Sequence, residues 1–245
     1  MWLKPFGTGS STVTKPLELA SAGEFLPAWR LWGGAQNCDG LGWRINWWQW
    51  DHISTGVSTG QFGSPPGNTW TNRTVFQKLD LLGTQMVSFR SWDLMLLGGV
   101  TYAGNTFITA ETGATSTSIN NYRFDGWGLT AGLLAYRNVP WITGLRGFGG
   151  VQWSGIYGNA IEDSGQIIPS IPLNTVVRTP LSSVLLHVVE LKIGMQYERH
   201  IGGGAIGFLS TGFESQFWGG IPVTSYDSWG NLGLVGFTLG AGIRR

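Results

Sequence analysis

Three histidines are the most obvious candidates for catalytic chemistry in this chain of 245 residues. His52 and His200 lie near the ends of apolar segments, and His187 stands close to a long polar stretch. A histidine beside a serine at a membrane surface could serve a lipase, but the chain has neither a His-Glu-x-x-His motif nor a phosphate loop. We therefore expect no enzymatic activity, no metal site and no cofactor.

A second kind of chemistry is indicated by polar side chains that stand in the middle of otherwise apolar segments. At the centre of a bilayer, an Arg or Lys that faced lipid would cost about 2–4 kcal/mol. We therefore expect these side chains to point inward and to line a lumen, with the amides of Asn46 and Gln152 on the same face. The predicted pore-lining residues are Arg30, Arg44, Asp80, Arg146, Glu190, Lys192, Gln196, Glu198, Glu214 and Gln216.

The elements that must position these side chains are β-strands. From Val188 to Glu198, apolar residues such as Leu191 and Ile193 alternate with residues such as Glu190 and Lys192. Strict alternation is typical of a strand with one apolar and one polar face. Similar segments recur along the chain, separated by turn residues such as Gly and Asn.

Ten strands are predicted, connected alternately by tight turns and long polar loops. The long loops are expected at 7–24, 53–74, 104–122, 157–183 and 219–230. This asymmetry is typical of outer-membrane barrels, which have short periplasmic turns and long external loops, and an even strand number puts both termini on the short-turn side. The predicted strands are 1–6, 25–36, 41–52, 75–89, 92–103, 123–136, 141–156, 184–199, 205–218 and 231–244.

The composition favours the same all-β fold, a single antiparallel up-and-down transmembrane barrel over 1–245. Charged residues make up 12% of the chain, against roughly 25% in an ordinary soluble domain. No stretch is long and apolar enough for a membrane-spanning helix. A net charge of +1 indicates no nucleic-acid partner. Cys38 is the one cysteine, so no internal disulfide can form.

Tryptophan is abundant, with 14 residues, and this residue favours the zone between acyl chains and water. Trp47, Trp48 and Trp50 interrupt simple alternation, so a β-bulge or an interfacial position is expected there. Two aromatic girdles are predicted at the membrane interfaces. They comprise Trp43, Trp92 and Trp141 beside short turns, and Trp50, Trp153 and Trp218 near long loops.

The chain resembles the pore-forming outer-membrane protein family typified by the Legionella major outer membrane protein, particularly its planctomycete members. The resemblance covers most of the chain from about residue 25 onward and implies an outer-membrane barrel that forms a pore. The chain departs from the family pattern at Leu82 and Thr101, where Glu and Arg are expected. It also departs at the carboxyl end, which lacks a terminal aromatic residue. The resembling stretches are 28–31, 37–44, 48–52, 78–81, 98–102, 124–128, 190–194 and 212–218.

We expect a bacterial outer-membrane location, without a signal peptide in this sequence, and passive passage of ions or small solutes through a narrow, charged lumen. The residues after Met1 read as the second half of a strand. The expected partners are outer-membrane lipid, small solutes or ions and the barrel-assembly machinery, and a homo-oligomer is left open. The alternatives are a plugged barrel with a structural or surface-binding role, a soluble β carbohydrate-binding module, and a soluble barrel or sandwich.

Overall fold

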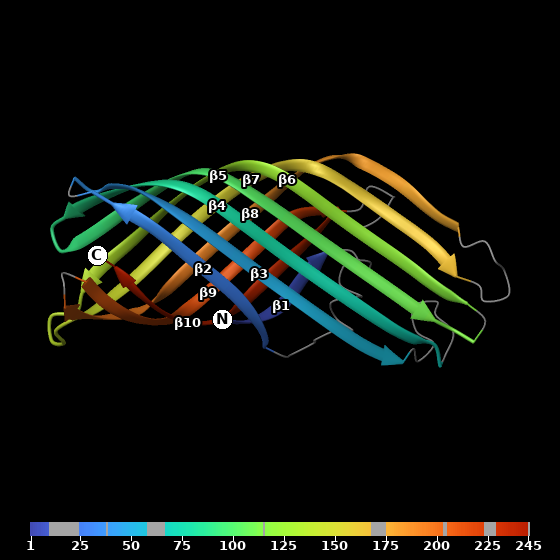
Figure 1. Ribbon diagram of the computed structural model, residues 1–245, viewed down its shortest axis with the longest axis horizontal. Helices are drawn as coiled ribbons and strands as arrows, with labels where there is room; N and C mark the ends of the chain where they lie inside the picture. Colours follow the sequence, from blue (N-terminus) through green and yellow to red (C-terminus); the bar gives the residue numbers. More distant parts are fainter. Residues whose placement is uncertain are drawn as a thin grey trace.

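The computed structural model describes residues 1–9, 25–37, 39–57, 67–114, 116–167, 175–202, 205–222 and 229–244. Within these residues the chain forms a closed barrel of ten antiparallel strands in up-and-down order (Figure 1). The predicted fold class is therefore confirmed. No described residue belongs to a helix long and apolar enough to cross a membrane. The strands are β1 (Trp2–Gly9), β2 (Leu26–Gln36), β3 (Leu41–Val57), β4 (Thr69–Phe89), β5 (Trp92–Thr112), β6 (Thr117–Asn138), β7 (Leu145–Ile167), β8 (Thr175–Gly202), β9 (Ala205–Pro222) and β10 (Trp229–Arg244).

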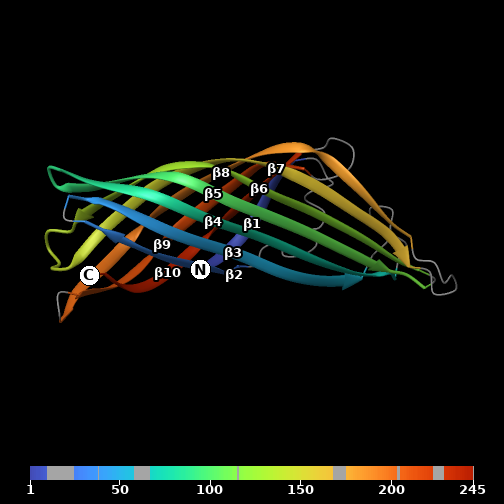
Figure 2. The same cartoon turned by 45° about the horizontal axis from the view of Figure 1, so that its top comes forward.

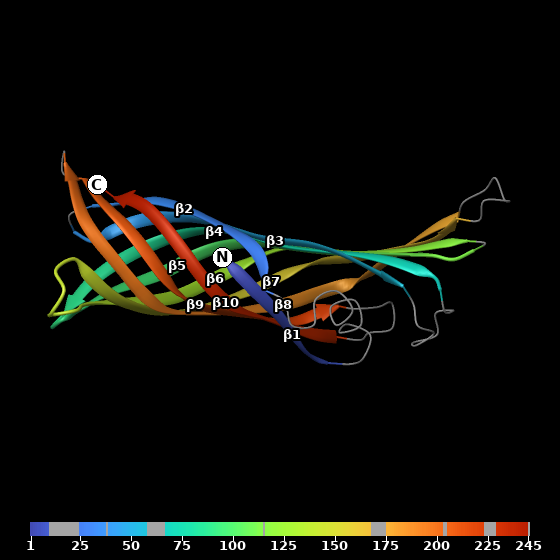
Figure 3. The ribbon, with the colours of Figure 1, turned by 90° about the horizontal axis from the view of Figure 1, so that it is seen from below.

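Several strands are longer than predicted, so two predicted long loops were largely wrong. β5 and β6 continue through most of 104–122, and β7 and β8 occupy much of 157–183. Polar residues in these segments pair across the hairpins, for example Thr106 with Arg123. The extended hairpins project beyond the rest of the barrel (Figure 3). The centres of the other predicted loops, Cys38 and Gly203 lie outside the described residues.

Connections at the opposite end are tight, and the β2–β3 turn shows why glycine is needed. Gly40 has a φ of 81°, and a Cβ placed there would meet the carbonyl oxygen of Met86 at 2.6 Å. Only glycine adopts this conformation without strain. The β6–β7 connection spans 139–144 rather than the predicted 137–140, and it is longer than the 113–116 connection of β5 to β6. Loop lengths therefore do not alternate strictly.

The two ends of the chain lie at different positions along the barrel axis (Figure 2). The carboxyl end of β10 reaches the short-turn end, as predicted. Trp2, by contrast, pairs with Phe237 partway along β10, and the amide of Ala28 donates to the carbonyl of Met1 over 2.8 Å. The prediction that both termini lie at the short turns is therefore correct for the carboxyl end alone.

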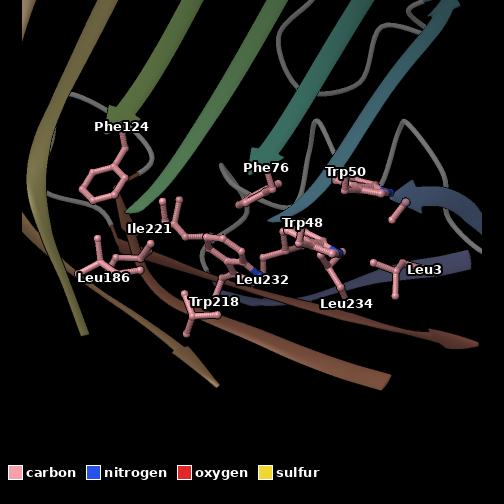
Figure 4. Close-up of a cluster of buried hydrophobic side chains, with 14 of the residues drawn as sticks. Leu3, Trp48, Trp50, Phe76, Phe124, Leu186, Trp218, Ile221, Leu232 and Leu234 are labelled. Atoms are coloured by element: carbon pink, nitrogen blue, oxygen red, sulfur yellow. The ribbon is translucent and has the colours of Figure 1, made fainter. Parts of the chain in front are cut away.

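Strand pairing fixes which side chains face the lumen. β3 pairs with β4 over 41–57 and with β2 over 42–50 without a register shift, so the predicted bulge at its tryptophans was wrong. Even-numbered residues of β3 face inward, which sends Trp48 and Trp50 into the interior. They join a buried apolar cluster that fills the loop-side half of the barrel, with side chains from strands on both sides (Figure 4).

Candidate functional site

A layer of buried charged side chains crosses the lumen on the short-turn side of the apolar cluster. We call it the charge layer, and it contains three cations and three carboxylates. Each comes from the inward-facing residues of a strand, so alternation brings it to the interior. Lys78 is 1% exposed, Asp80 0% and Glu190 1%. The layer consists of Arg30 on β2, Lys78 and Asp80 on β4, Glu190 and Lys192 on β8, and Glu214 on β9.

Glu190 is the centre of this layer. Its Oε1 lies 2.7 Å from Nζ of Lys78, and its Oε2 lies 2.9 Å from Nη2 of Arg30. Nζ of Lys192 lies 3.3 Å from the same Oε2. Lys78 and Arg30 approach from strands on the far side of the lumen from β8, so these contacts connect opposite walls.

The other two carboxylates are also held by several donors. Asp80 accepts a hydrogen bond from Asn46 Nδ2 over 2.9 Å, from Thr101 Oγ1 over 2.7 Å and from Gln152 Nε2 over 3.1 Å. Its Oδ1 also lies 2.9 Å from Nζ of Lys78. Glu214 pairs with Arg30 and accepts a hydrogen bond from Gln216 Nε2 over 2.9 Å. Buried charges must be paired and hydrogen-bonded. Every charged group of this layer has an ionic partner, while Nε of Arg30 is a buried donor without a hydrogen-bond partner among the described residues.

Aromatic side chains pack across the lumen on the loop side of the charge layer. The aromatic layer consists of Trp48, Trp50, Phe76, Phe107 and Trp218. The rings of Trp48 on β3 and Trp218 on β9 lie 5.7 Å apart, and those of Phe76 and Trp218 lie 5.0 Å apart. Nε1 of Trp218 donates to Oε1 of Gln216 over 3.2 Å, and Gln216 in turn donates to Glu214, so hydrogen bonds connect the two layers. Direct contacts therefore span the lumen at two successive heights.

The remaining predicted pore-lining residues also point inward, but they lie outside the charge layer. Arg146 pairs with Asp93 and has Glu198 at 3.5 Å, while Gln196 Nε2 donates to Glu198 over 2.7 Å. This group lies toward the short turns, so the charged residues form two clusters rather than one mixture. Asp93 was not predicted as a member.

Arg44 lies alone among the predicted cations. Its guanidinium carbon lies 4.6 Å from the centre of the Trp32 ring, a cation–π contact. No described carboxylate forms an ion pair with it. The positive charge of Arg44 therefore faces the short-turn half of the lumen, where several inward positions on β6 and β10 are glycines.

Lys78 is the most important residue that the sequence reasoning missed. It stands two positions before Asp80, so both side chains fall on the same face of β4. The pattern that placed Asp80 inside therefore placed Lys78 inside as well. The local signal was present, because Gln77 and Leu79 take the outward positions around it.

The outward face carries many exposed apolar side chains, which we call the apolar band, among them Trp29, Leu129, Leu191 and Ile193. Trp43, Trp92, Trp141 and Trp153 are exposed at or beside this band, where the girdles were predicted. Trp50 and Trp218 are 0% exposed, so their assignment to a girdle was wrong. Both are even-numbered, like the inward-facing Asn46 and Gln216 of the same strands, so alternation directs their side chains into the lumen. Trp127 and Tyr157 are exposed aromatic residues that the prediction omitted.

Outward charges mark where the apolar band ends. Toward the loop end of β3 and β4, Arg73 Nη2 lies 2.7 Å from Asp51 Oδ2, and on the extended β7–β8 hairpin Arg178 Nε lies 2.7 Å from Asp163 Oδ1. The hydrogen bonds from Arg178 hold the pKa of Asp163 below its usual value. Exposed ion pairs of this kind belong in water. The apolar band therefore ends near the positions of these ion pairs, and the hairpins continue beyond it.

The histidines are dispersed. The rings of His52 and Trp50 lie 6.1 Å apart inside the barrel, and those of His187 and Trp153 lie 6.0 Å apart outside it. Residues 56–60 spell Gly-x-Ser-x-Gly, which the sequence reasoning overlooked, but in hydrolases this motif joins a strand to a helix. Here Gly56 and Val57 still belong to β3, and the serine lies outside the described residues.

Sequence comparisons do not assign the chain to a known family. No protein-family model matches the chain, and no curated protein sequence matches it. The resemblance to the pore-forming outer-membrane family stays an expectation from the sequence motifs.

Proposed function

We propose that this protein is a bacterial outer-membrane barrel whose lumen is closed by its own side chains, with a structural or surface-presenting role. The observation that carries the proposal is the pair of cross-lumen layers. Glu190 of β8 contacts Lys78 of β4 and Arg30 of β2, while Trp48 of β3 contacts Trp218 of β9. These side chains fill the space through which a solute would pass.

The outward surface supports placement in a membrane. So many exposed apolar side chains on one face of a soluble protein would cause association, and they are typical of membrane or partner contact. The band is free of outward charges over the central parts of β4, β5 and β7 to β9, and on β6 the outward pair Arg123–Asp125 lies on the loop side of Trp127. The other outward ion pairs lie toward the loop end as well. In this proposal the short turns face the periplasm, and the extended hairpins present their tips outside the cell.

Passive ion passage, the leading expectation from the sequence, becomes the second candidate. It is favoured by Arg44, whose charge faces the short-turn half of the lumen without a carboxylate partner. Passage would require the side chains of both layers to move aside. The proposed role involves no catalytic step, and kinship with the pore-forming family is part of the same proposal.

The test is single-channel recording after refolding in detergent and insertion into a planar bilayer. The wild type should insert and remain electrically silent. A variant that combines Trp48→Ala and Trp218→Ala with Lys78→Ala and Glu190→Ala should remove cross-lumen contacts from both layers and give measurable current. Trp153→Ala, which removes an outward tryptophan, serves as the matched control and should stay silent.

Discrete conductance steps from the wild type would contradict the closed lumen and support the second candidate. Ion selectivity that shifts in Glu190→Gln would then locate the path at the charge layer. A protein that stays soluble without detergent and does not float with liposomes would contradict the membrane location itself.

A further inference from the structure

A hollow of about 510 Å³ lies at the short-turn end of β8, β9 and β10. Strand pairing explains its shape. Arg199 pairs with Gly207, Tyr197 with Leu209, and Leu209 with Ala241. The small residues Gly207 and Ala241 leave space between larger neighbours. Its volume falls within the roughly 300–1,000 Å³ of ordinary ligand sites, although it is an open groove.

The lining of this groove is apolar along most of its length and cationic at one end. Tyr197, Leu209 and Ile243 are exposed on the outward face and form its sides. Arg199 is the next outward residue of β8 toward the turn, and its side chain is exposed. No described carboxylate forms an ion pair with Arg199. An apolar groove that ends at one free guanidinium is complementary to a ligand with an apolar chain and an anionic head.

We propose that this groove binds an anionic phospholipid, with one acyl chain along Leu209 and Ala241 and the phosphate on Arg199. The inference rests on the proposed membrane location, because only there does the groove meet lipid. Arginine near a membrane border keeps its stem on apolar surface and its charge at the headgroups. A second copy of the chain would instead need to bring a carboxylate to Arg199, and the same groove on that copy offers none.

The experiment is native mass spectrometry of the refolded protein in detergent, with phosphatidylglycerol or phosphatidylcholine of identical acyl chains added. The wild type should retain phosphatidylglycerol more strongly. Arg199→Gln should weaken that retention about fivefold, the worth of one basic residue near an anionic lipid surface. Ala241→Phe should fill the groove and weaken both lipids. Arg137→Gln is the matched control, because Arg137 is also exposed at the short-turn end, where its guanidinium lies 5.3 Å from the centre of the Trp92 ring.

Equal retention of the two lipids, or equal loss in Arg199→Gln and Arg137→Gln, would overturn the proposal. A lipid-independent dimer that Ala241→Phe disrupts would also overturn it and assign the groove to a second copy. Flotation with liposomes separates these outcomes from failure of the proposed membrane location, because a variant that floats normally has kept the barrel in the bilayer.

Discussion

Replacing Glu190 by glutamine should strongly destabilise the barrel. The carboxylate is 1% exposed and lies within 3.3 Å of three cations, Arg30, Lys78 and Lys192. Glutamine keeps the shape but removes the charge, which leaves buried cations uncompensated. Breaking a buried ion pair by removing one partner costs about 3–5 kcal/mol of unfolding free energy.

The assay is urea unfolding of the protein in lipid vesicles, followed by tryptophan fluorescence. Asp163→Asn is the control, because its pair with Arg178 is exposed to solvent and should contribute little to the unfolding free energy. A second variant that combines Glu190→Gln with Lys78→Met removes one charge of each sign. It leaves Arg30 and Lys192 paired with Glu214, while Asp80 keeps its hydrogen bonds from Asn46, Thr101 and Gln152, so it should recover part of the lost unfolding free energy.

A loss below about 1 kcal/mol for Glu190→Gln would refute the reasoning, because that is the value of a solvated pair. Such a result would mean that water reaches the charge layer and that the lumen is open at this height. Failure of the double variant to recover any free energy would instead show that packing around these side chains matters more than their charge balance.

Three further predictions concern the aromatic layer, the β2–β3 turn and the extended hairpins. Trp218→Ala should lower the unfolding free energy by about 3–5 kcal/mol in the same urea assay, since it leaves a cavity among buried rings, and an unchanged midpoint would contradict the layer. Gly40→Ala should cost about 1–3 kcal/mol because φ is positive there, and a neutral result would mean that the turn rearranges. Arg178→Gln should raise the pKa of Asp163 measured by NMR toward its usual value. The pKa of Asp163 is lower in the folded than in the unfolded protein, so the pair stabilises the fold above the unfolded pKa, and this stabilisation is lost as the pH falls through the folded pKa. A pKa of Asp163 that does not change in the variant would contradict the pairing.

The sequence determined the strands and their faces, because alternation is a local property of the backbone. Val188–Glu198 shows this directly: its inward and outward sets follow from parity alone, and they agree with the structure. Strand ends were harder to predict. The segments that extend β5 to β8 are rich in Ser, Thr and Asn, which also suit loops, so composition could not distinguish a water-exposed hairpin from a loop.

Only the tertiary structure decided which inward residues meet. Lys78 and Glu190 are 112 positions apart, and they come together because barrel closure and strand tilt bring β4 and β8 to face each other at that height. The same geometry separates Arg146 from the charge layer and buries Trp50 against Phe76. The alternation along a strand predicts whether a side chain points into the lumen. The stagger between strands, which no local pattern records, decides its height and partner, and therefore whether the lumen is lined or filled.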